Sequence, residues 1–174
     1  MYRTITLAAA LAAALGIAGA AAETAGPTDP QIAHIAYTAG QIDIEAGKQA
    51  LEKSQNEAVR AFAQQMIGDH TAVNDQALAL VKKLNVTPED NATSKSLSEA
   101  ANAEGKKLAG LSGAAFDKAY ADNEVAYHKA VDDAVSKTLI PSAQNAELKA
   151  LLQNGLKLFE AHLAHAEQLA KQLQ

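Results

Sequence analysis

Apolar residues recur every three or four positions along most of this chain, which is the spacing of one face of an α-helix. The pattern predicts four long helices, at about residues 29–54, 56–85, 114–139 and 145–173. Asp29-Pro30 and Asn56 are typical residues for a helix start, and the third helix is expected to stop at Pro141. No stretch alternates clearly with period two, so a β-sheet is not expected.

The connections between these helices indicate how they are arranged. Residues 87–113 are polar and rich in alanine, and they hold at most one short helix, at about residues 94–108. This segment is long for a connection without structure, so we interpret it as a partly helical crossover. A short turn, a long crossover and a short turn are the connectivity of ferritin-like proteins. We therefore expect an all-α fold, a ferritin-like four-helix bundle with its crossover between the second and third helices.

The N-terminus has the features of a secretory signal peptide. Arg3 precedes an apolar run from Ile5 to Ala18, and small residues follow at Ala20 and Ala22. A retained membrane anchor is the alternative, but the run is shorter than the ~20 residues that span a bilayer. We predict a signal peptide over 1–22, a tether over 23–28 and the bundle domain over 29–174. The mature protein is then soluble and periplasmic or secreted.

Composition excludes several classes of protein. The chain contains no cysteine, so it has no disulfide, no cysteine metal site and no lipidated N-terminal cysteine. Its net charge is −5 and it has no basic run, which argues against binding nucleic acid and against docking to a membrane by charge. The sequence does not indicate a protein partner or an oligomeric state.

Polar side chains interrupt the apolar stripe of every predicted helix. Each residue advances a helix by about 100°, which places His70 near the centre of its stripe and Asp69 toward the edge. Each interruption lies near the middle of its helix, and midpoints meet at one level in an antiparallel bundle. The residues expected in this inward layer are Asp43, Asp69, His70, Glu124, His128 and His162.

Two interpretations of this layer remain open. Buried polar groups need partners, so the side chains either bind a metal ion or bond to one another. Imidazoles and carboxylates suit one transition-metal ion such as Zn, Cu or Fe, carried by His70, His128 and His162 with carboxylates completing the set. The alternative is a metal-free network that fixes helix register. No inward Glu-x-x-His motif is present, so ferroxidase or di-iron oxygenase activity is not supported.

Several segments resemble the exported bacterial domain-of-unknown-function family 4142, whose members are often labelled predicted outer-membrane proteins. They are "IDIEAGKQALEKS", "VRAFAQQMIGDHTAVNDQAL", "FDKAYADNEVAYHKAV" and "ELKALLQNGLKLFEAHLAHAEQL". The resemblance implies a ferritin-like bundle and brings no established activity. It marks Asp69, His70, Phe116, Asp117, Tyr120, His128, His162 and Leu163. The family usually has Glu where this chain has Asp43, which shortens the reach of that carboxylate. The outer-membrane label finds no support in the sequence.

Two other functions remain possible beside metal binding. The chain could be an envelope stress or interaction module that uses its outer helix faces, and an exposed apolar patch would favour this hypothesis. A redox or hydrolytic enzyme would need an open coordination position and a channel to solvent. The sequence shows no nucleophile elbow and no phosphate-binding loop, so we predict a protein that is not an enzyme.

Overall fold

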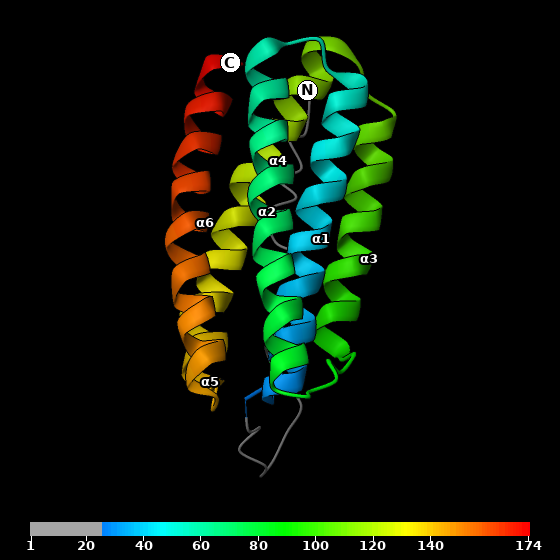
Figure 1. The fold of residues 1–174 in the computed structure, drawn as a ribbon. Helices are drawn as coiled ribbons and strands as arrows, with labels where there is room; N and C mark the ends of the chain where they lie inside the picture. Colours follow the sequence, from blue (N-terminus) through cyan, green and yellow to red (C-terminus); the bar gives the residue numbers. More distant parts are fainter. Residues whose placement is uncertain (1–25) are drawn as a thin grey trace.

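The computed structural model describes residues 26–174, and these residues form helices and short connections without a strand. The long helices lie side by side (Figure 1). They are α1 (Asp29–Lys53), α2 (Glu57–Lys83), α3 (Ala92–Ala109), α4 (Gly113–Ala134) and α6 (Ala146–Gln172). A π-helical turn (Val135–Leu139) and the short α5 (Ile140–Ser142) continue α4. The all-α prediction is confirmed, whereas the predicted signal peptide lies outside the described residues.

Helices α2 and α6 start close to where the sequence predicts, because side chains there accept hydrogen bonds from free backbone N–H groups. The Asn56 side chain accepts from the backbone nitrogens of Ala58 and Val59 at 2.9 and 3.2 Å. At the other end of the chain, Asn145 caps α6 in the same way. The Asp29 carboxylate accepts hydrogen bonds of 2.8 Å from the backbone nitrogens of Gln144 and Asn145. These bonds tie the start of α1 to the start of α6.

Two predicted boundaries differ from the structure. The crossover helix spans 18 residues, longer than predicted, because the Asn91 side chain and Ser94 form a reciprocal cap at its start. The third helix does not stop at Pro141, because the chain widens into the π-helical turn and then enters α5. Pro141 occupies the first turn of α5, where its missing N–H costs little.

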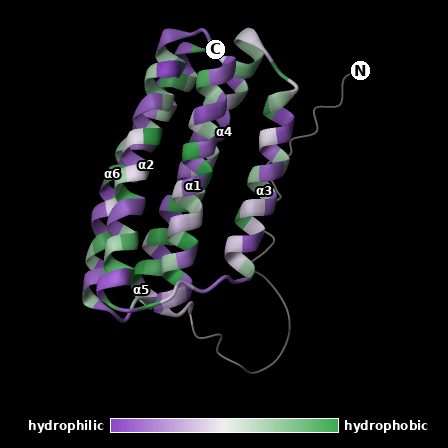
Figure 2. Cartoon of the chain, turned by 45° about the vertical axis from the view of Figure 1, so that its right-hand side comes forward, coloured by the Kyte–Doolittle hydropathy of each residue, from purple (hydrophilic) through white to green (hydrophobic). Residues whose placement is uncertain are grey.

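The direction of each helix determines which midpoints meet. The chain colours of Figure 1 show α1, α3 and α6 running one way and α2 and α4 running the other. In Figure 2, α3 stands at one side of the molecule. It is held on α1 by hydrogen bonds from the side chains of Gln49 and Lys53 to the carbonyls of Gly105 and Ala109, at 2.9 and 2.7 Å. Its buried residues are Ser94 and Leu108.

The buried core is divided into two apolar clusters. One includes Phe62, Met66, Phe116 and Leu169, near the ends of α1 and α6. The other includes Ile32, Ile35, Val135, Leu139 and Leu152, near their starts. The predicted polar residues of α1, α2, α4 and α6 lie between these clusters in the sequence of each helix. The polar layer is therefore enclosed above and below by apolar packing. No helix in residues 26–174 is both long and apolar enough to cross a membrane.

Candidate metal centre

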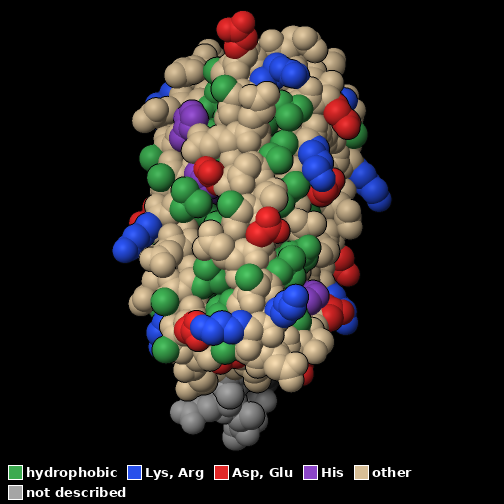
Figure 3. All heavy atoms as spheres, in the orientation of Figure 1, with side chains coloured by type: hydrophobic (Ala, Val, Ile, Leu, Met, Phe, Trp, Pro, Cys, Tyr) green, Lys and Arg blue, Asp and Glu red, His purple; other side chains and the backbone are tan. Residues whose placement is uncertain are grey.

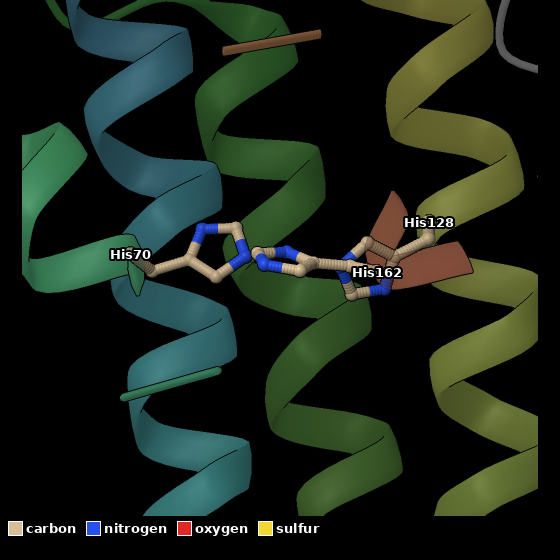
Figure 4. Close-up of side chains that lie close together, drawn as sticks. All are labelled: His70, His128 and His162. Atoms are coloured by element: carbon tan, nitrogen blue, oxygen red, sulfur yellow. The ribbon is translucent and has the colours of Figure 1, made fainter. Parts of the chain in front are cut away.

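The structure brings the predicted polar residues together from four helices. One nitrogen from each of His70, His128 and His162 lies within 4.8 Å of a nitrogen of each of the other two. Figure 4 shows these three imidazoles at one height along the helices, pointing toward one another. Asp43, Glu124 and His128 form a second group of the same kind, so His128 belongs to both. Asp69 belongs to neither group and contacts His162 instead.

Burial differs sharply within this layer. Relative exposure is 3% for His70, 1% for His128 and 0% for His162. The two carboxylates beside them are equally enclosed, at 2% for Asp43 and 1% for Glu124. The side chain of Asp69, by contrast, is 37% exposed. This agrees with its predicted position toward the edge of the stripe.

Two of the histidines are held by one ring nitrogen and leave the other without a hydrogen bond. His162 Nε2 lies 2.9 Å from Asp69 Oδ2, and its Nδ1 is buried without a partner. His128 Nδ1 lies 3.0 Å from the backbone carbonyl oxygen of Glu124, and its Nε2 is buried without a partner. In both cases an oxygen acceptor positions the N–H side of the ring, so the lone pair lies on the unpartnered nitrogen.

His70 is held by packing instead. Its ring stacks on Phe159 with centroids 5.0 Å apart and planes 9° from parallel. Its Nε2 lies 3.2 Å from Asp43 Oδ2, but neither ring nitrogen makes a hydrogen bond with acceptable geometry. The sequence could not identify this stacking partner, because helical phase gives the face of a side chain and not its contact across the bundle.

The carboxylates add buried oxygens that also lack partners. Asp43 Oδ2 lies 3.8 Å from His128 Nε2, while Asp43 Oδ1 makes no hydrogen bond. Glu124 Oε2 lies 3.7 Å from His128 Nδ1 and makes no hydrogen bond either. The Tyr120 hydroxyl, on a fully buried side chain, is likewise unpartnered. The family resemblance marks Tyr120, but nothing in the sequence indicates that its hydroxyl lacks a hydrogen-bond partner.

Burial controls the protonation of these groups. It lowers the pKa of His70 to about 3, with His162 acting in the same direction and Asp69 against it. Burial also lowers the pKa of His128 and of His162, although the nearby carboxylates oppose the change. All three imidazoles are therefore neutral near pH 7, which is the form that binds metals.

The pKa values of the two enclosed carboxyls shift upward, opposite to those of the imidazoles, since burial disfavours the charged form of a carboxyl. Burial raises the pKa of Asp43, with His128 opposing this change. It raises the pKa of Glu124 well above its usual value, and the neighbouring Asp43 adds to the effect. Without a nearby cation, these shifts favour the protonated, neutral forms of both carboxyls.

Comparisons with known proteins agree with the predicted resemblance. The model of the family described as a domain of unknown function, DUF4142, matches residues 14–169, which include every residue of the polar layer. No curated protein matches the chain, and no solved structure does. The chain belongs to the DUF4142 family, whose description gives no function.

Proposed function

We propose that the protein binds one divalent transition-metal ion in the buried layer between α1, α2, α4 and α6. The ligands are His70, His128 and His162, together with the Asp43 carboxylate. The observation that carries this proposal is the set of three neutral, converging imidazoles with unpartnered nitrogens. Two of them have the other nitrogen already engaged by an oxygen, as metal-ligating histidines almost always do.

The spacing of the donors supports this proposal. Ligand atoms lie about 2.0–2.2 Å from a zinc ion in proteins, so neighbouring ligand atoms are roughly 3–4 Å apart. The nitrogens of the three histidines lie within 4.8 Å of one another, and Asp43 Oδ2 is 3.2 Å from His70 Nε2. Small side-chain movements would therefore close the set around one ion. Imidazole with carboxylate suits Zn, Cu or Fe, and the donors do not choose among these metals.

Charge explains why a single divalent ion fits. Beside a bound cation Asp43 and Glu124 ionise and bring two negative charges into a layer of neutral imidazoles, and one divalent ion balances them. Buried charges are tolerated when they are paired, whereas an uncompensated buried charge is strongly unfavourable. Glu124 then contributes charge beside the ion, and Asp69 orients His162 from outside.

The same residues support a ferritin-like arrangement as part of the proposal. The four helices that carry the layer are α1, α2, α4 and α6, and α3 is the crossover between the second and third of them. The order of directions, with α2 parallel to α4, is that of a bundle with one long connection. We also propose export by the N-terminal segment, on the strength of its signal-peptide pattern.

The surface gives less support to an interaction module. Within residues 26–174, the large hydrophobic side chain that is clearly exposed is Leu78, at 44%. Figure 3 shows hydrophobic side chains on this face scattered among polar and charged ones, without a continuous apolar patch. We therefore propose metal binding alone.

Equilibrium dialysis against Zn²⁺, followed by elemental analysis of the purified chain, tests the proposal. The wild type is expected to retain about one ion per chain, and the double variant His70→Ala, His162→Ala none. The chain offers a matched control in His34→Ala, His165→Ala, which removes two histidines outside the layer and should leave the content unchanged. Equal zinc in the layer variant and the wild type would refute the site.

A further inference from the structure

A buried metal site needs a route from solvent, and the layer is accessible at one residue. Five of its six side chains are 0–3% exposed. Asp69 is 37% exposed, and its Oδ2 atom contacts the fully buried His162 at 2.9 Å. A single carboxylate thus lies in solvent on one side and contacts the layer on the other.

The line of contact between α1 and α2 is tightly closed. A Cβ atom added to Gly47 would lie 3.0 Å from the backbone oxygen of Ala63 and 2.9 Å from Ile67. At Gly40 an added Cβ would lie 2.4 Å from the Asn74 side chain. Backbone therefore packs closely against the facing helix at these two glycines, and the surface hollow at this contact is lined by none of the residues of the polar layer.

Side-chain bonds hold α4 against α1 and against α6. The Tyr127 hydroxyl donates a 2.9 Å hydrogen bond to the carbonyl of Ala39 and so joins α4 to α1. Between α4 and α6, Lys129 forms a 2.9 Å ion pair with Glu167. This pair carries no net charge, and the surface hollow beside it is lined by none of the residues of the polar layer.

The contact between α2 and α6 is different because the exposed Asp69 bonds there to a residue of the buried layer. It contains the Asp69–His162 pair and a second pair, in which His165 Nδ1 lies 2.9 Å from Gln65 Oε1. Phe62 lies against His165 with ring centroids 5.1 Å apart, on one side of the Asp69–His162 pair. Phe159 lies on the other side, 6.1 Å from His162. Asp69 thus places a partly exposed carboxylate between two aromatic side chains.

We infer that Asp69 is the entry port for the metal ion. Its partly exposed carboxylate captures the cation between α2 and α6, and the ion then passes His162 to reach the buried donors. His162 lies between the port and the buried donors, since its Nε2 contacts Asp69 and its Nδ1 is enclosed. An incoming ion must displace the Asp69–His162 hydrogen bond, so this bond closes the port when no ion is passing. This inference rests on the proposed metal site.

Stopped-flow mixing of the metal-free protein with Co²⁺, followed by its visible absorption bands, tests the port. The variant Asp69→Asn keeps the side-chain shape and removes the charge, and we expect its association rate to fall at least tenfold. The dissociation rate, measured with excess chelator, should not rise. Asp75→Asn is the matched control, because it removes an exposed charge from the same helix, and its association rate should stay within twofold of the wild type.

The outcomes separate this inference from the proposed function. If Asp69 only orients His162, the variant will lose Co²⁺ faster while its association rate stays unchanged, and the port is overturned although the site stands. A similar slowing in Asp75→Asn would show a general effect of surface charge and would also overturn the port. Absence of Co²⁺ bands in the wild type would overturn both the site and its port.

Discussion

The substitution Asp43→Asn is expected to change stability in opposite directions with and without metal. In the metal-free protein Asp43 is 2% exposed, and its Oδ1 atom makes no hydrogen bond. Burial raises the pKa of Asp43, with His128 and Glu124 opposing the change, so the ionised form of this carboxyl is disfavoured in the metal-free protein. A buried polar group without a partner costs about 1–3 kcal/mol.

An amide at position 43 removes that cost. Asn keeps one acceptor oxygen and adds two N–H donors, which can reach the unpartnered Glu124 Oε2 and an unpartnered imidazole nitrogen. We therefore expect Asp43→Asn to raise the free energy of unfolding of the metal-free protein by about 1–2 kcal/mol. A metal-free network in which Asp43 accepts a charge-assisted hydrogen bond predicts a loss of about 1.5–3 kcal/mol instead.

With metal bound, Asp43→Asn is expected to lower the free energy of unfolding instead. Removing one partner of a buried charge pair costs about 3–5 kcal/mol. Since about 1.4 kcal/mol corresponds to a tenfold change, Zn²⁺ affinity should fall by roughly 100-fold or more. The wild type should gain about 2.7 kcal/mol of stability at a free Zn²⁺ concentration of about 100 times its Kd, and the variant should gain much less.

Urea unfolding followed by far-UV circular dichroism, with Zn²⁺ and with chelator, measures all four free energies. The control is Asp122→Asn, an exposed carboxylate paired with Lys118 at 3.2 Å, which should change stability by less than about 0.5 kcal/mol. A lower metal-free stability for Asp43→Asn would refute this reasoning and favour the network.

Three further predictions concern pH, packing and metal removal. Burial raises the pKa of Asp132 to about 6, so the stability that depends on the protonated form of this carboxyl is lost as pH rises through that value. After a discount for partial exposure, Asp132→Asn should be about 1 kcal/mol more stable than the wild type near pH 8 and equal to it below pH ~4, as measured by urea unfolding. Gly47→Ala should destabilise the protein by about 1–2 kcal/mol, because its Cβ would lie 3.0 Å from the α2 backbone, whereas Gly105→Ala, with nothing within 4 Å, should stabilise it by about 0.5–1 kcal/mol; thermal unfolding distinguishes these signs. Chelator should lower the Tm of the Zn²⁺-loaded wild type and leave that of His70→Ala, His162→Ala unchanged, since the variant has lost two ligands.

Helical periodicity was sufficient to predict the composition of the layer. The inward direction of His70, His128 and His162 follows from the period of 3.6 residues, because a single wrong phase would have moved a ring to the surface. Their common level follows from antiparallel packing of helices of similar length. The partial exposure of Asp69 was also visible as a position at the edge of its stripe.

Contacts between helices could not be obtained in this way. The stacking of His70 on Phe159 and the engagement of His162 by Asp69 depend on the rotation and offset of neighbouring helices, which the period of one helix does not contain. The π-helical turn was missed for a different reason. Pro141 signals a missing N–H, and the chain can respond either by ending the helix or by starting a new helical segment, as α5 does.

Anomalous diffraction from crystals of the Zn²⁺-loaded protein, recorded at the zinc absorption edge, is the measurement that tests the central claim most directly. The proposed site predicts one strong peak per chain inside the bundle, within about 2.0–2.2 Å of a nitrogen of His70, His128 and His162 and of an Asp43 oxygen. Peaks confined to surface carboxylates or to His34 and His165, with none in the layer, would contradict it.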